Sequence, residues 1–259
     1  MSRIAIDNSH APRPSAIRAH LQELRCELLR MLREPMYVIP TLLFPALFYA
    51  MFGLLMGGRS GSGAAQYLLA TYGVFGTLGA ALFGFGVTVA NDRERGLFAL
   101  RRAMPAPPSS WITARLAKAM LFSLVVSLEL ALLAGVFGGV SLSPGQWAAL
   151  WGINMLGAIP FGAIGLLIGV ICSANAAPAV VNVLFLPMAF LSGLWLPLSM
   201  LPEVFARVAP VWPAWHHAQL ALRVVGQDGG GSPWLHAGAL VTIGVVCAAI
   251  ALRRLARVG

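Results

Sequence analysis

The chain has 259 residues, of which 58% are hydrophobic and only 10% are charged, and its mean hydropathy is +0.79. Soluble domains carry about 25% charged residues, so this composition leaves too few polar side chains to cover a globule in water and excludes a soluble enzyme. It also excludes an intrinsically disordered chain, which would be poor in apolar residues and rich in charge. Most of the chain is therefore expected to lie in lipid.

The net charge of +9 comes from 18 basic and 9 acidic residues. The basic residues lie between apolar runs instead of forming one stripe, so they indicate membrane topology and not a nucleic-acid surface. The three cysteines, Cys26, Cys172 and Cys247, are widely spaced and contain no C-x-x-C pair. They predict neither a disulfide framework nor a zinc cluster.

Six apolar runs are long enough to cross a bilayer core, which takes about 20 residues of helix. We predict an all-α membrane protein with six transmembrane helices in a single domain, residues 1–259. Its parts would be a cytoplasmic N-terminus (1–36), a six-span bundle (37–252) and a cytoplasmic tail (253–259). The six predicted spans are residues 37–57, 66–90, 119–140, 147–172, 178–196 and 234–252.

The orientation of the spans follows from the distribution of Arg and Lys. The N-terminus, the second and fourth connections and the tail together carry 15 of these residues, whereas the other connections carry three. Because positive residues are retained on the inner side, both termini are expected in the cytoplasm. The chain is therefore predicted to be a multi-pass protein of the cell (inner) membrane. Residues 1–36 also lack the apolar core and cleavage site of a signal peptide.

An amphipathic helix of about 17 residues is predicted between Ser15 and Arg33, because apolar residues recur there at steps of four and three with charges on the other faces. We expect this helix to lie flat on the lipid of the inner leaflet. Packing against a partner protein is the alternative. The residues assigned to this interfacial helix and its exit are Ile17, Leu21, Leu24, Leu28, Arg33 and Pro35.

The connection at residues 91–118 is the longest one expected on the cytoplasmic side. It begins with alternating charges, continues as a short amphipathic stretch and is stopped by prolines. A connection that only returned the chain could be a few residues long, so we interpret it as a docking helix for a cytoplasmic partner, with positive-inside anchoring as the alternative. The residues assigned to this docking segment are Asp92, Arg93, Glu94, Arg95, Gly96, Leu97, Phe98, Leu100, Arg101, Met104 and Pro105.

Residues 197–233, expected on the outside, are predicted to form short interfacial or re-entrant helices before the last span, with tryptophans at headgroup depth. The adjacent His216 and His217 invite a metal hypothesis. Neighbouring residues on a helix point about 100° apart, and no carboxylate or cysteine lies at ligand spacing. We therefore predict no metal site.

Glu129 lies near the middle of the third span, where a carboxylate is costly unless it is paired, protonated or facing water. It indicates either a substrate pathway or a hydrogen bond between helices, for which Ser123, Ser127 and Asn154 are nearby partners.

Further pathway candidates are Phe44, Phe48 and Phe52 on one face of the first span, and Asn182 in the fifth. For the phenylalanines, a stripe facing lipid is the alternative to a cavity lining. The spans also contain three G-x-x-x-G pairs, a spacing that permits close helix approach, although chance pairs are expected among 28 glycines. The pairs are Gly53 with Gly57, Gly135 with Gly139, and Gly165 with Gly169.

The motifs of ATP binding and of hydrolysis are absent from the sequence. A P-loop requires a lysine after its second conserved glycine, and the only lysine, Lys118, stands between two alanines. The sequence also contains no H-E-x-x-H and no complete G-x-S-x-G. We therefore expect a non-catalytic chain without a cofactor, driven by another polypeptide.

Over nearly its whole length, the chain resembles the permease subunit of the ABC-2 family of ATP-binding-cassette exporters. Arg33-Glu34-Pro35 resembles the R-[DN]-P that follows the family's connecting helix, and Leu43-Phe44-Pro45 resembles L-x-P in its first span. Residues 93–105 resemble E-R-E-x-G-T-L…L…x-P, with Leu97 and Phe98 in place of Thr-Leu. Residues 191–223 resemble the S-G…P…L-P…P…A…L-R pattern before the last span.

The resemblance implies that two permeases, identical or homologous, form the substrate pathway above two ATPase subunits that bind ATP and Mg²⁺. The docking segment would then be the coupling helix. Family substrates include drugs, lipids, polysaccharides and small signalling molecules, and the short chain favours a drug or a lipid-like molecule. The alternative from another class is a proton- or ion-coupled secondary transporter using Glu129, which would predict further intramembrane acids or repeated halves.

Overall fold

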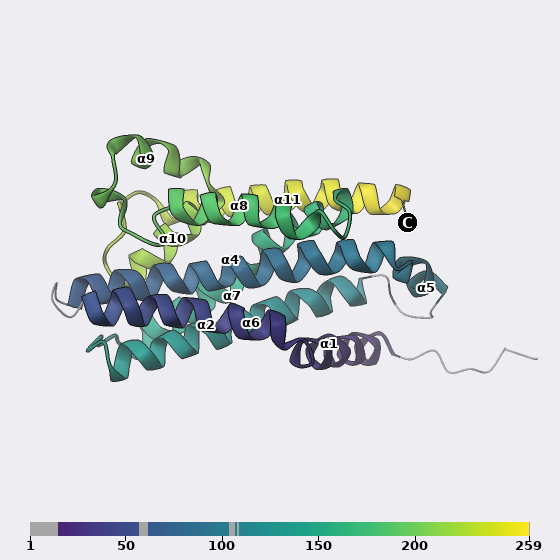
Figure 1. Cartoon of the computed structure of the whole chain (residues 1–259), viewed down its shortest axis with the longest axis horizontal. Coiled ribbons are helices and arrows are strands. Elements are labelled where there is room, and N and C mark those ends of the chain that lie inside the picture. Colours follow the sequence, from purple (N-terminus) through teal and green to yellow (C-terminus); the bar gives the residue numbers. More distant parts are fainter. Residues whose placement is uncertain (1–14, 57–61, 104–106, 108, 259) are drawn as a thin grey trace, which may run out of the picture.

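The computed structural model describes residues 15–56, 62–103, 107 and 109–258, and within these ranges the chain is helical, with no strand. The helices run alongside one another as a bundle (Figure 1). Their bounds are α1 Ala16–Leu32, α2 Pro35–Phe48, η1 Tyr49–Met56, α4 Ser62–Glu94, α5 Leu97–Ala103, α6 Ser110–Val136, α7 Pro144–Ile171, α8 Ala177–Leu191, η2 Leu198–Met200, α9 Glu203–Val208, η3 Ala209–Val211, α10 Pro213–Val224 and α11 Pro233–Val258.

Among the residues that the structure describes, five helices are long and apolar enough to cross a membrane, which confirms the prediction of an all-α chain with several candidate spans. They are Tyr37–Leu54, Gly63–Glu94, Ser110–Val136, Pro144–Ile171 and Pro233–Arg257. The remaining predicted span, residues 178–196, contains the shorter apolar helix α8. Its 15 residues extend about 22 Å at 1.5 Å per residue, which is less than the roughly 30 Å of a bilayer core.

The third span begins earlier than predicted. Helix α6 starts at Ser110 and not at residue 119, so Arg115 and Lys118 belong to the helix and not to the connection before it. Both side chains are buried, with 0% and 7% of their surface exposed. Charged residues are tolerated there because acidic residues of α1 and α4 pair with them.

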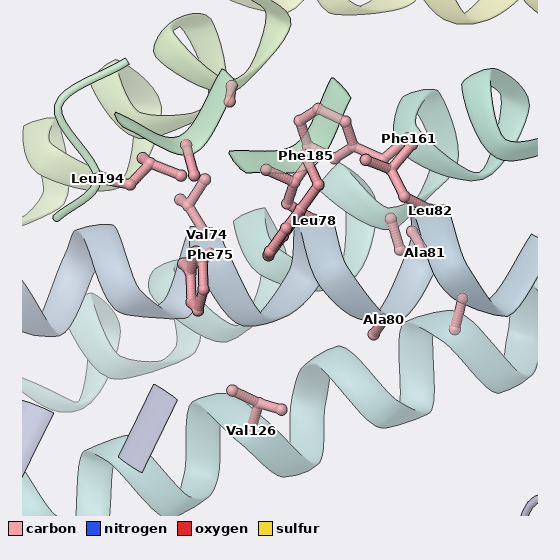
Figure 2. Close-up of a cluster of buried hydrophobic side chains, with 14 of the residues drawn as sticks. Val74, Phe75, Leu78, Ala80, Ala81, Leu82, Val126, Phe161, Phe185 and Leu194 are labelled. Carbon is pink, nitrogen blue, oxygen red and sulfur yellow. The ribbon is translucent and has the colours of Figure 1, made fainter. Parts of the chain in front are cut away.

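Helix α4 forms the centre of the bundle, with neighbours on several sides (Figure 1). Its sequence is apolar around most of its circumference, which is typical of a buried helix. Figure 2 shows its side chains among those of three other helices: Val74, Phe75, Leu78 and Leu82 of α4 with Val126 of α6, Phe161 of α7 and Phe185 of α8.

Among the described glycines, the third predicted pair, Gly165 with Gly169, forms a close helix contact. A Cβ atom at Gly165 would lie 2.9 Å from the Leu82 carbonyl oxygen, and one at Gly169 would lie 2.8 Å from that of Gly86, so the backbones of α7 and α4 touch there. By contrast, a Cβ atom at Gly135 or Gly139 would meet no atom within 4 Å.

A Cβ atom at Gly53 would meet the ring of Tyr49 of its own helical segment, and Gly57 lies outside the described residues. The first and second predicted pairs therefore provide no observed backbone contact between helices.

The two ends of the bundle carry different elements. Helices α1 and α5 and the C-terminal end of α11 lie towards one end, whereas α9 and α10 lie towards the other (Figure 1). The predicted short helices before the last span are present as η2, α9, η3 and α10. We call the end with α1 and α5 the docking end and the opposite end the distal end.

Candidate functional site: an aromatic cavity and a buried charge cluster

A cavity of about 410 Å³ lies between α2, α4 and α8. Three of the predicted pathway residues, Phe44, Phe48 and Asn182, line it, whereas Phe52 and Glu129 do not. The volume lies in the range of small-molecule sites in proteins. The wall is largely aromatic, with Phe44, Phe48, Phe75, Phe83, Phe185 and Trp195.

Phe48 connects the aromatic groups of this wall. Its ring centroid lies 6.2 Å from that of Phe44, 6.3 Å from that of Phe52 and 6.1 Å from that of Trp195. The three predicted phenylalanines therefore form one stack that continues onto Trp195. Phe44 remains half exposed at the open side of the cavity, so the stack has a cavity-facing part and an outward-facing part.

Three side chains of the cavity lining, Tyr37, Thr41 and Asn182, make hydrogen bonds to backbone carbonyls. The Tyr37 hydroxyl donates to the Ala80 carbonyl at 2.9 Å, and the Thr41 hydroxyl donates to the Tyr37 carbonyl at 2.7 Å. The Asn182 Nδ2 donates to the Pro178 carbonyl at 3.0 Å, and its Oδ1 can accept a further hydrogen bond. No charged side chain is among the described residues that line this cavity. It is suited to an aromatic or amphiphilic molecule.

Glu129 does not use the partners that were considered for it. The Asn154 Nδ2 donates to Ser127 Oγ at 2.9 Å, and Ser127 Oγ donates to the Ser123 carbonyl at 2.8 Å, so these residues bond to one another. Within the described part of the chain, the buried Glu129 Oε2 has no hydrogen-bond partner. Of the two alternatives for Glu129, the hydrogen bond to Ser123, Ser127 or Asn154 is not formed among the described residues.

A cluster of buried charges joins α1, α4 and α6 at the docking end. Arg115 of α6, which is fully buried, donates from Nε to Glu27 Oε1 at 3.0 Å and from Nη2 to Asp92 Oδ2. Lys118 Nζ donates to Glu27 Oε2 at 2.6 Å. Burial alone would raise the pKa of Glu27, but the adjacent cations Arg115 and Lys118 outweigh it and lower this pKa to about 2.

Arg30 extends the cluster to the start of α2. Its Nη1 donates to Asp92 Oδ1 at 3.2 Å and its Nε donates to Glu34 Oε1 at 3.1 Å. Glu34 is the residue directly before α2. One carboxylate of α4 is thereby connected through a single guanidinium to the first turn of the helix that lines the cavity.

The next two residues of α4 bind the turn between α7 and α8. The guanidinium of Arg93 donates to the carbonyls of Val170 and Cys172, the latter at 2.7 Å. Glu94 Oε1 accepts a hydrogen bond from the Ala174 backbone N–H at 2.8 Å. A cation at the carbonyl end of a helix is favourable because these carbonyls lack partners within the helix.

The docking segment divides into inward-facing and outward-facing residues. Phe98 is buried against Trp111, with ring centroids 5.1 Å apart, and Arg101 Nη1 donates to Glu23 Oε1 of α1. Leu97, Phe98 and Leu100 were assigned to the docking segment as its apolar residues. Phe98 requires a correction, because its own chain already covers its ring, as it covers the carboxylate of Asp92.

The outward-facing part of the segment consists of Arg95, Gly96 and Leu100, which are exposed, and Leu97, which is half-buried. The predicted Met104 and Pro105 lie outside the described residues.

Helix α1 matches the predicted amphipathic helix closely, and it packs on α6. Ile17 and Leu21 remain exposed, and Leu24 and Leu28 are half-buried. Arg33 lies exposed at the C-terminal end of α1, and Pro35 is the first residue of α2. The apolar stripe is thus only partly covered by the rest of the chain.

The sequence analysis did not include Glu27, Arg115 or Lys118 among the site residues. The available signals were an acidic residue in an amphipathic helix, which was assigned to its polar face, and two cations next to an apolar run, which were counted as topology signals.

The two adjacent histidines do not converge. His216 Nδ1 lies 3.0 Å from Nδ1 of His236, whereas His217 Nε2 donates to the Ile153 carbonyl at 3.2 Å. Among the residues that the structure describes, no group of three or more potential metal ligands occurs.

Comparison with known proteins gives two matches. A family model described as ABC-2 type transporter matches residues 22–223. A curated relative, "Putative transport permease YvfS" of Bacillus subtilis (strain 168), is 27% identical over 212 residues, covering 80% of this chain and 84% of the relative. The region matched by the family model begins within α1 and ends within α10, so it contains both the charge cluster and the cavity.

Proposed function

This chain belongs to the ABC-2 type transporter family, and we propose that it is the transmembrane permease of an exporter whose energy comes from a separate ATP-binding-cassette subunit. The partner would bind ATP and Mg²⁺, since this sequence has no P-loop. Its only lysine is engaged with Glu27. The permease itself would carry out no hydrolysis.

The cavity between α2, α4 and α8 is the observation that carries this proposal. It combines three pathway candidates, Phe44, Phe48 and Asn182, in one space. Stacked aromatic rings and a few hydrogen-bonding groups suit a flat, amphiphilic drug or a lipid-like molecule. A charged polysaccharide finds no counter-charge in the described lining.

Two copies, or this chain with a homologous permease, would complete the pathway. The cavity is open on one side, where Phe44 and Leu186 keep 50% and 45% of their surface exposed. A second permease facing this side would enclose the cavity and cover both residues. Mass measurement in nanodiscs should give two permeases and two ATPases, and a transport-active single permease would exclude this arrangement.

The protein would lie in the cell (inner) membrane with its docking end in the cytoplasm, because 15 of the 18 basic residues of the chain lie in segments predicted on that side. Helix α8 with the turn that follows it would also cross the membrane and bring the number of spans to six. An even number of spans is required for both termini to lie in the cytoplasm. Helix α1 would lie at the inner leaflet, with Ile17 and Leu21 in lipid.

The ATPase would bind the outward-facing part of the docking segment. Arg95 and Leu100 are exposed, and Leu97 is half-buried. Apolar side chains would supply most of the affinity and the arginine would determine the register.

The test is Leu100→Asp in the full chain, co-expressed with its ATPase and reconstituted in nanodiscs and liposomes. Leu100 has 59% of its surface exposed, so the fold should persist while copurification of the ATPase and efflux of a lipophilic rhodamine dye are lost. The control is Arg207→Ala, which changes an exposed residue at the distal end and should leave all readouts unchanged. Unchanged copurification in Leu100→Asp would place the docking site elsewhere, and α1 would then be the next surface to test.

A proton-coupled transporter is the second candidate, because Glu129 presents a buried carboxylate oxygen without a partner among the described residues. It predicts that Glu129→Gln abolishes transport driven by a pH gradient in liposomes without ATP. For the ATP-driven exporter, no such gradient-driven transport is expected in the wild type.

A further inference from the structure

Three consecutive residues at the end of α4 each contact a different part of the chain. Asp92 accepts hydrogen bonds from Arg115 and Arg30, Arg93 donates to the end of α7, and Glu94 accepts from the turn before α8. Successive side chains on a helix point about 100° apart, so one turn can contact three neighbours at once. Helix α5 begins only three residues after this turn.

The contact of Asp92 leads to the α2 wall of the cavity. Arg30 lies between Asp92 and Glu34, with distances of 3.2 and 3.1 Å to the two carboxylates. Glu34 is followed directly by α2, whose Tyr37 and Thr41 line the cavity. A movement of the last turn of α4 would therefore reach the first turn of α2 through one chain of ion pairs.

The contacts of Arg93 and Glu94 lead to the opposite wall. The Arg93 guanidinium donates to carbonyls at the end of α7, and the Glu94 carboxylate accepts from the Ala174 N–H. The turn between α7 and α8 is therefore bonded to α4 through both its carbonyl groups and a backbone N–H. Helix α8 begins three residues later, at Ala177, and its Asn182 and Phe185 line the cavity.

We propose that Asp92, Arg93 and Glu94, whose side chains are bonded within this chain and do not belong to the outward-facing part of the docking segment, are positioning residues. They couple that outward-facing part to both walls of the cavity, Asp92 to α2 and the other two to α8. This inference rests on the proposed function, since it assumes that an ATPase acts on the docking segment. When that segment moves, the two walls change their separation together, and the cavity changes its affinity for substrate.

The side chain of Glu94 offers the clearest test because it is exposed and its contact is a single hydrogen bond. Glu94→Ala removes the acceptor, whereas Glu94→Gln retains an oxygen that can accept from the Ala174 N–H. Arg93→Met removes the hydrogen bonds to α7 while keeping an unbranched side chain. Each variant is reconstituted as the full chain with its ATPase, and thermal unfolding is recorded in the same preparation.

Four quantities are measured: copurification of the ATPase, ATP hydrolysis, efflux of the rhodamine dye per ATP hydrolysed, and dye affinity with and without ATP. In Glu94→Ala and Arg93→Met we expect normal copurification and hydrolysis, but efflux per ATP lower by about fivefold or more, the lower end of typical coupling effects. Dye affinity should also lose its dependence on ATP. Glu94→Gln should behave like the wild type in all four.

Wild-type efflux per ATP in Glu94→Ala would overturn the inference, as would an equal loss in Glu94→Gln. If Arg93→Met alone unfolds, the Glu94 pair still decides. If the wild-type chain itself neither binds an ATPase nor exports dye, the proposed function fails instead. A loss of ATPase copurification that occurs in Leu100→Asp alone concerns the docking site and leaves this inference unchanged.

Discussion

The contact between α4 and α7 allows one substitution to be compared at two sites of the same helix. In Gly169→Ala the added Cβ would lie 2.7 Å from Val89 Cβ and 2.8 Å from the Gly86 carbonyl oxygen, whereas in Gly152→Ala it meets no atom within 4 Å. An ordinary contact begins at 3.4 Å, so at Gly169 the helices must separate by about 0.7 Å, the difference between 3.4 and 2.7 Å. Helix α4 is central and packed on several sides, which leaves little room for this movement.

Overpacking of this kind costs about 1–3 kcal/mol, while alanine gains up to about 1 kcal/mol over glycine in helix propensity at both sites. The propensity gain cancels when the two variants are compared. Gly169→Ala should therefore unfold at a lower temperature than Gly152→Ala by roughly 2–12 °C, taking 2–4 °C per kcal/mol for a chain of this size. The assay is thermal unfolding of both purified proteins in the same detergent. Equal melting temperatures would refute the close contact of α4 and α7.

Two further predictions concern the charge cluster. Asp92→Asn should destabilise the chain by about 3–5 kcal/mol in thermal unfolding, because it leaves the buried Arg115 without its full counter-charge, whereas Glu203→Gln in the exposed pair with Arg207 should cost less than about 1 kcal/mol. Because the pKa of Glu27 is lowered from 4.5 to about 2, its stabilising effect is present above pH 4.5 and is lost as the pH falls towards 2. The difference in melting temperature between the wild type and Glu27→Gln should therefore be constant from pH 8 to 5 and shrink below pH 4.5, and a constant difference down to pH 3 would contradict the ion pairing.

Local sequence pattern determined the elements of this protein. A run of about 20 apolar residues has few alternatives to a buried or membrane-spanning helix, and five such runs are long helices in the structure. The period of apolar residues predicted a helix between Ser15 and Arg33, and α1 begins and ends within one residue of these bounds. Ser15 is its N-cap, a position that serine favours. The phenylalanine spacing placed Phe44, Phe48 and Phe52 on one face, where they stack.

The three-dimensional structure decided which of the G-x-x-x-G pairs forms a contact between helices. Gly135 with Gly139 and Gly165 with Gly169 have the same spacing, but Gly139 lies beyond the last residue of α6, with a φ of +61°, and a Cβ atom at Gly135 would meet no atom within 4 Å. The second pair faces the backbone of α4. A spacing specifies a face of its own helix and contains no information about the neighbour on that face.

The same limit applies to the charges. Arg115 and Lys118 look like topology signals because a cation near an apolar run is expected to stay in water. Their counter-charge, Glu27, is 88 and 91 residues away in the sequence, and only the packing of α1 on α6 brings it near. Burial of an ion depends on the partner as much as on the ion itself, so the pairing of charges across helices was decided by the assembled bundle.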